Sequence, residues 1–165
     1  MKTTLFIALM FTTLSYSQKN TAYIGVGLDL RNAIEGSMPT GYKPALDFNI
    51  KAGAIHHQFQ VECFYENFKS INFQSYGFFL AQNAPTLIKN LYIVNGIELG
   101  GIMRKSNNTY FLAGYTGEFR LEVSEKMLVG LSYNIRYRSD LIHYGNKFPT
   151  VNSTFLTIYY KLNEQ

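Results

Sequence analysis

Apolar and polar residues alternate one for one in eight short segments of this chain, and no other feature restricts its fold as strongly. In the first segment Ile24, Val26 and Leu28 fall on one face, while Asp29 falls on the other. Successive side chains of a strand point to opposite faces, so this period predicts strands with one apolar and one polar face. The predicted strands are 22–31, 45–54, 58–66, 74–81, 91–103, 110–123, 127–138 and 152–162.

The N-terminal residues have the pattern of an export signal. Lys2 precedes an apolar stretch at 5–14, and Ser15-Tyr16-Ser17 forms the small-x-small sequence of a cleavage site. We therefore predict a signal peptide at 1–17, followed by one domain at 18–165.

Alternation behind an export signal is typical of a chain that crosses a membrane as a closed sheet. Lipid offers no hydrogen bonds, so only helices and closed barrels satisfy every backbone polar group there. No apolar run after the signal is long enough for a transmembrane helix. The 13 tyrosines and 13 phenylalanines suit the aromatic belts of a membrane–water interface.

The connections between the predicted strands add a second indication. Those at 32–44 and 139–150 are long, while those around 56–57 and 124–126 are tight turns. Short periplasmic turns alternate with long outer loops in outer-membrane barrels, although 83–90 is longer than this rule expects. We predict an all-β fold, an eight-stranded antiparallel up-and-down transmembrane β-barrel in the bacterial outer membrane.

The pattern of residues 18–165 resembles the small eight-stranded outer-membrane barrels of the OmpX and OmpA-transmembrane-domain type. The end of the last strand, 158–162, is similar to the C-terminal signal that the barrel-assembly machinery reads. The resemblance implies that this machinery, outer-membrane lipid and lipopolysaccharide are partners, with any extracellular ligand unidentified. The net charge of +4 without a basic run gives no indication of nucleic-acid binding.

The polar faces carry a balanced set of charges that we expect to fill the lumen. An eight-stranded barrel is just wide enough for side chains, and unpaired charges inside it are costly. We expect Glu118 and Arg120 to pair, with Glu98 within reach. The predicted charge network is Asp29, Arg31, Asp47, Lys51, Glu62, Glu98, Glu118, Arg120, Glu122, Arg136, Arg138 and Lys161, with Glu66 and Arg104 on the same faces.

Glycines on the polar faces are predicted to make room for the long Arg and Lys side chains. The pair Gly100-Gly101 indicates a bend or bulge. The glycines in question are Gly25, Gly27, Gly53, Gly96, Gly100 and Gly130.

One stretch, His143-Tyr144-Gly145-Asn146, resembles the His-x-Ser-Asn motif of the outer-membrane lipid A deacylases, which are similar eight-stranded barrels. In that family the serine is the nucleophile and the histidine its general base. Gly145 occupies the serine position, which leaves Ser153 as the only substitute nucleophile for His143. We therefore predict no enzymatic activity and no cofactor, and the alternative is a barrel of the lipid A deacylase kind with His143 and Ser153 as the candidate residues. We predict no metal site either, because the adjacent His56-His57 should point to opposite sides.

A soluble secreted barrel of the lipocalin kind is the other class that alternation allows. Such a binder turns its apolar face inward, and a membrane barrel turns it outward. The loop lengths and balanced charges favour the membrane form. It requires the following residues to face outward: Leu28, Phe48, Val61, Leu99, Phe119, Leu131 and Ile158.

Overall fold

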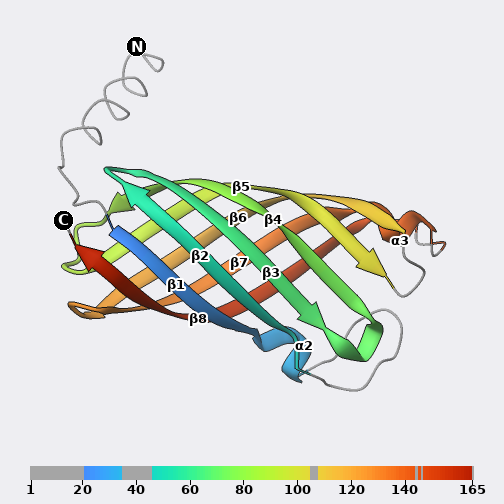
Figure 1. Cartoon of the computed structure of the whole chain (residues 1–165), viewed down its shortest axis with the longest axis horizontal. Helices are drawn as coiled ribbons and strands as arrows, with labels where there is room; N and C mark the ends of the chain where they lie inside the picture. Colours follow the sequence, from blue (N-terminus) through green and yellow to red (C-terminus); the bar gives the residue numbers. More distant parts are fainter. Residues whose placement is uncertain (1–20, 35–45, 105–107, 144, 146, 165) are drawn as a thin grey trace, which may run out of the picture.

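The chain folds into a closed barrel of eight antiparallel strands, each paired with its sequence neighbours and the last with the first (Figure 1). The computed structural model describes residues 21–34, 46–104, 108–143, 145 and 147–164. The predicted fold is confirmed. The strands are β1 (Thr21–Asp29), β2 (Phe48–His56), β3 (Phe59–Phe68), β4 (Phe73–Pro85), β5 (Leu91–Arg104), β6 (Thr109–Ser124), β7 (Met127–Arg138) and β8 (Thr150–Glu164).

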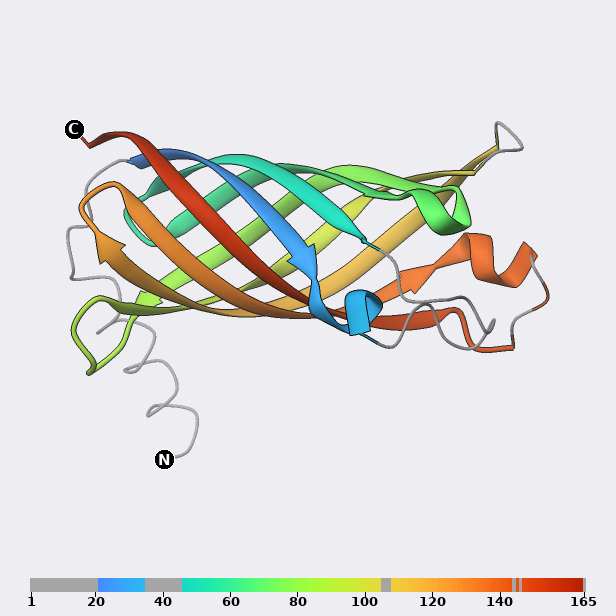
Figure 2. The ribbon, with the colours of Figure 1, turned by 90° about the horizontal axis from the view of Figure 1, so that it is seen from below.

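The two ends of the barrel differ. Short turns close one end, where β1 starts and β8 finishes, while short helices stand at the other (Figure 2). The short helices are α2 (Leu30–Ile34), the 3-10 helix η2 (Lys69–Ile71) and α3 (Ser139–His143). No helix in the described part of the chain is long and apolar enough to cross a membrane.

Strand β1 ends earlier than predicted because its last carboxylate caps a helix. Asp29 Oδ1 accepts the backbone N–H groups of Arg31 and Asn32, at 2.9 and 3.1 Å. These bonds satisfy amides that the start of a helix leaves free. The alternation of apolar residues continues through Leu30, but the cap decides the conformation, so the prediction that Arg31 lies in β1 is wrong.

Strand β4 is longer than predicted. Asn83, Ala84 and Pro85 continue its pairing with β5, which shortens the connection to 86–90. Strand β5 has no bulge at Gly100-Gly101, because both glycines pair in regular register with β4 and β6.

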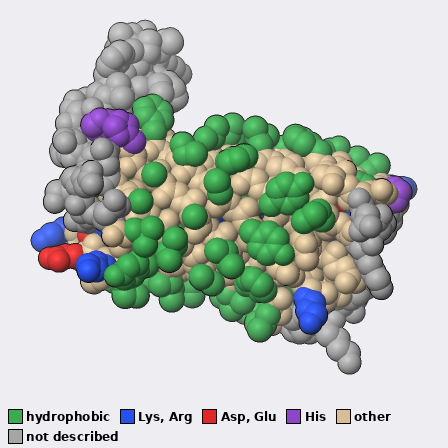
Figure 3. Space-filling model, in the orientation of Figure 1, with side chains coloured by type: hydrophobic (Ala, Val, Ile, Leu, Met, Phe, Trp, Pro, Cys, Tyr) green, Lys and Arg blue, Asp and Glu red, His purple; other side chains and the backbone are tan. Residues whose placement is uncertain are grey.

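The barrel wall is apolar on the outside and its interior is largely polar. Hydrophobic side chains cover the face seen in Figure 3. Leu28 is half-buried on this wall. The other residues predicted to face outward are exposed, and they are Phe48, Val61, Leu99, Phe119, Leu131 and Ile158. This polarity is opposite to that of a lipocalin-type binder.

Aromatic rings share the interior with the charges. The strand with aromatics on both faces, β4, turns Phe73 and Phe79 inward and Tyr76 and Phe78 outward. One apolar cluster inside consists of Phe64, Phe68, Phe73, Phe79, Ala81, Val94, Ile102 and Leu112, and a second of Tyr23, Ile55, Leu128 and Tyr159.

The interior glycines make room mainly for groups other than the Arg and Lys chains that were expected. A Cβ on Gly25 would collide with the Tyr159 ring, and one on Gly130 with the Glu118 carboxylate. The glycine that faces an arginine stem is Gly114, where a Cβ would lie 2.9 Å from Cγ of Arg136 on β7.

Candidate functional site

The central feature of the lumen is Arg120 on β6, a fully buried guanidinium with three hydrogen bonds. Arg120 donates from Nε and Nη2 to the two oxygens of Glu118, at 3.0 and 3.1 Å. Its Nη1 donates to Gln60 Oε1 at 3.0 Å. The guanidinium carbon also lies 4.2 Å from the centroid of the Tyr159 ring. Such a forked arginine–carboxylate pair is among the stronger polar contacts in proteins.

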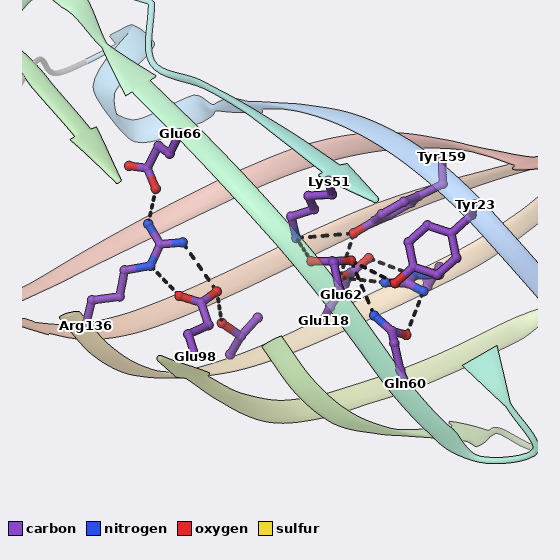
Figure 4. Close-up of polar contacts among 11 residues, drawn as sticks. Tyr23, Lys51, Gln60, Glu62, Glu66, Glu98, Glu118, Arg136 and Tyr159 are labelled. Atoms are coloured by element: carbon purple, nitrogen blue, oxygen red, sulfur yellow. Dashed lines mark hydrogen bonds and ion pairs between the residues drawn. The ribbon is translucent and has the colours of Figure 1, made fainter. Parts of the chain in front are cut away.

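Two tyrosines join this pair to a second one. Tyr159 Oη donates to Glu118 Oε2 at 3.0 Å, and Tyr23 Oη donates to Glu62 Oε2 at 2.9 Å. Glu62 in turn lies 3.4 Å from Lys51 Nζ. Figure 4 shows Lys51, Glu62, Glu118 and the two tyrosines converging from different strands. We call Tyr23, Lys51, Gln60, Glu62, Glu118, Arg120 and Tyr159 the central cluster.

A separate group surrounds Arg136 on β7. Its Nε donates to Glu98 Oε2 at 2.6 Å, and its Nη1 binds Glu66 on the opposite wall (Figure 4). Thr116 Oγ1 donates to Glu98 Oε1 at 2.8 Å. Glu98 is therefore paired with Arg136 and not with the Arg120 group. The register explains this, because Gly114 stands directly between Glu98 and Arg136 across three strands and leaves their side chains free to meet.

Ion pairs also lie at both ends of the barrel interior. At the short-turn end, Lys161 Nζ lies 2.8 Å from Glu122 Oε1. At the helical end, Asp140 Oδ2 accepts from both Arg104 and Arg138, at 2.7 and 2.8 Å. Burial by itself raises the pKa of Asp140, but the two guanidinium groups outweigh it and hold the pKa below its usual range. The sequence prediction left Asp140 out because its position was assigned to an outer loop.

Asp29 and Asp47 belong to a different arrangement at the helical end. The side-chain amide of Asn32 donates to both carboxylates, at 3.1 and 2.7 Å. Among the described residues, no Lys or Arg forms an ion pair with either of them. Burial, followed by the nearby charge of Glu66, raises the pKa of Asp47 to about 8. Arg31, predicted in the network, donates instead to the carbonyl of Asn152 at 2.6 Å.

Some buried polar atoms in the described lumen have no partner within the protein. They include Asp47 Oδ1 and both amide atoms of Asn49 and Asn134. Groups of this kind are usually satisfied by internal water. The space between the clusters is therefore lined by polar groups, and ion pairs do not satisfy all of them.

The residues proposed for hydrolytic chemistry occupy different settings. His143 ends α3, with its ring 5.5 Å from that of Tyr110. Ser153 is buried on β8, where it pairs in register with Asn134. Gly145 has a φ of 80° and its N–H donates to Ile142 O at 3.0 Å, so this position favours glycine for its backbone. Tyr144 and Asn146 lie outside the described residues.

Metal-binding side chains do not gather in the described part of the chain, which contains no group of three or more His, Cys, Asp or Glu able to hold an ion. The rings of His56, the last residue of β2, and His57 are 4.3 Å apart, so the expectation that they point to opposite sides is wrong.

The closed eight-stranded fold defines a barrel of the small outer-membrane type, and comparison with solved structures agrees. The chain is similar to the outer membrane protein Ail of Yersinia pestis in a bilayer nanodisc, with 14% identity, a TM-score of 0.54, and coverage of 87% of this chain and 100% of that one. It is similar to outer membrane protein H (OprH) of P. aeruginosa, with 17% identity, a TM-score of 0.59, and coverage of 88% and 100%. No protein-family model matches the sequence, and no curated protein matches it. The likeness establishes the fold, as the predicted resemblance to small eight-stranded barrels implied.

Proposed function

We propose that this protein is a non-enzymatic barrel of the bacterial outer membrane, exported by its N-terminal signal, with a plugged lumen and outer loops for contact at the cell surface. The observation that carries the proposal is the polarity of the wall. Exposed leucine, isoleucine, valine and phenylalanine side chains cover the outside, while charged residues of the central cluster are buried. Water would penalise so large an apolar surface, and lipid is the solvent that favours it.

The plug follows from the central cluster and the Arg136 group. Arg136 on β7 reaches across the lumen to Glu66 on β3. Arg120 pairs with Glu118 on its own strand and extends to Gln60 on β3. Lys51 pairs with Glu62 on the adjacent strand. Each of these cations is almost completely buried. Displacing one would leave a buried charge without its partner, so passage of ions along the axis requires breaking pairs that stabilise the fold.

The proposed partners follow from the outer-membrane location. Outer-membrane lipid and lipopolysaccharide would surround the wall, and the barrel-assembly machinery would insert it. The surface at the helical end, with α2, η2 and α3, would contact any extracellular ligand.

Fractionation of cells that express the full chain tests the proposal. We expect the protein in the outer-membrane fraction, resistant to extraction with urea, and migrating faster on a gel before heating than after. In planar bilayers it should give no steady conductance. Recovery of folded protein from the soluble periplasmic fraction would overturn the membrane location, and a stable open-channel current would overturn the plug.

A further inference from the structure

Two amide side chains interrupt the apolar outer wall on neighbouring strands. Gln82 on β4 and Asn95 on β5 are directly paired in register. The outward residues that flank Asn95 on β5 are Ile93 and Ile97. On β4, Leu80 is an outward neighbour of Gln82. Apolar rungs therefore lie both above and below Asn95, and the amide belongs to the interior of the apolar belt and not to its rim.

Beside Asn95 the wall is hollowed at Gly117 on β6. Gly117 pairs with Asn95, and a Cβ placed there would meet only Asn95 Oδ1, at 3.5 Å. Tyr115 and Phe119, the outward neighbours of Gly117 along the strand, are 51% and 59% exposed. Tyr133, its partner on β7, is 49% exposed. We call the surface formed by Gln82, Asn95, Tyr115, Gly117, Phe119 and Tyr133 the amide hollow.

The hydrogen-bonding capacity of Asn95 is only half used. Its Oδ1 accepts from Tyr115 Oη at 3.1 Å, while its Nδ2 has no hydrogen-bond partner among the described residues. The amide of Gln82 makes one long contact, 3.5 Å from its Nε2 to Gln58 Oε1. Donors without partners in hydrocarbon cost free energy, and polar side chains at such depth commonly bond to a neighbouring protein segment.

A second copy of the chain provides a hydrogen-bond partner for Asn95 and an apolar side chain for the space over Gly117. An amide is a donor and an acceptor, so two Asn95 side chains related by a two-fold axis can bond to each other. The projecting Phe119 ring is an apolar side chain suited to the open space over Gly117 of the other copy. Acyl chains of lipid carry no acceptor at this depth.

We propose that the protein forms a homodimer in the membrane through the amide hollow, with Asn95 and Gly117 at the centre of a two-fold interface. The inference rests on the membrane location proposed above. Small residues that allow close approach, together with a polar side chain, are a recurring means of association within lipid.

Association of the full chain, refolded into phosphatidylcholine vesicles, tests the proposal. Energy transfer between donor- and acceptor-labelled copies is measured against the protein-to-lipid ratio, with reductant present because Cys63 is exposed. Asn95→Leu removes the amide and Gly117→Leu fills the hollow. Asn95→Leu is expected to weaken the dimer about three- to tenfold, as loss of one such polar contact within lipid does. Gly117→Leu is expected to weaken it at least as much, because its side chain prevents close approach of the second copy.

Asn67→Leu is the matched control, because Asn67 is an outward amide near the helical end of β3 whose Nδ2 contacts Tyr65 Oη, and β3 contributes no residue to the hollow. It should leave association unchanged. Gel mobility before heating verifies that each variant folds. A folded wild type that stays monomeric at every protein-to-lipid ratio, or a dimer that neither Asn95→Leu nor Gly117→Leu weakens, would overturn the dimer and leave the membrane location standing. Failure to insert into vesicles would overturn the membrane location itself.

Discussion

Glu118 and Arg120 lie two residues apart on β6 and meet inside the barrel through two parallel hydrogen bonds of 3.0 and 3.1 Å. Neither side chain reaches solvent. Each therefore depends on the other for compensation of its charge, and this relationship gives the first prediction.

Arg120→Ala should destabilise the barrel by about 3–5 kcal/mol, because it leaves Glu118 buried without its cation. Glu118→Ala should have a comparable cost. The double variant should cost less than the sum of the two, since no lone charge remains. Denaturant titrations in detergent micelles measure all three, with Glu125→Ala in the exposed turn after β6 as control. Additive losses would mean that water screens the two groups and that the lumen is open.

The second prediction concerns pH and Asp47, which lies just before β2. Its pKa is about 8 in the folded chain and about 3.8 when unfolded, so only the folded state holds this proton between those values. The stabilisation is complete below pH 3.8 and is lost as the pH rises through 8. It should change by on the order of 1 kcal/mol per pH unit in this window. Asp47→Asn should flatten the dependence and make the barrel more stable than the wild type above pH 8.

Denaturant midpoints between pH 5 and pH 9 measure the effect. Asp140→Asn is the control, because the pKa of Asp140 is lowered and its contribution is lost only when the pH falls below the unfolded value of about 3.8. Its curve should therefore run parallel to that of the wild type between pH 5 and pH 9. This variant should be destabilised at neutral pH, where it leaves Arg104 and Arg138 without their shared carboxylate. Parallel pH curves for the wild type and Asp47→Asn would contradict the prediction.

The sequence predicts some strand bounds well, and it predicts other strand ends and side-chain partners less well. Strand β7 spans Met127–Arg138, the predicted range, because its alternation is unbroken and a tight turn precedes it. The predicted end of β1 was wrong, because the helix cap made by Asp29 outweighs an alternation of apolar residues that continues through Leu30. The bond of Glu98 to Arg136 was not predicted, for another reason. Alternation tells which face a residue occupies, while the register that brings Glu98 to Arg136 depends on strands far apart in the sequence.

The third prediction tests the solvent around the wall. Leu131 is 47% exposed and pairs with Phe119 and Leu156, both apolar and outward. An arginine near the middle of a lipid-facing strand costs about 2–4 kcal/mol, while a surface substitution in water usually changes stability by less than about 0.5 kcal/mol. Leu131→Arg should therefore lower the unfolding free energy in vesicles by the larger amount. Glu125→Arg, at the turn, is the control, and equal small effects of both would indicate a soluble barrel.

The last prediction is that the chain does not hydrolyse lipid A. Hydrolysis needs a nucleophile within about 2.6–3.2 Å of a general base. Gly145 offers no nucleophile beside His143, and its φ of 80° would strain a serine placed there. Ser153 faces the lumen and is buried, whereas His143 is exposed at the end of α3. Mass spectrometry of lipid A from cells that express the wild type, His143→Ala or Ser153→Ala should give three identical acyl patterns. Loss of an acyl chain that requires both His143 and Ser153 would establish a hydrolase and disprove the non-enzymatic function.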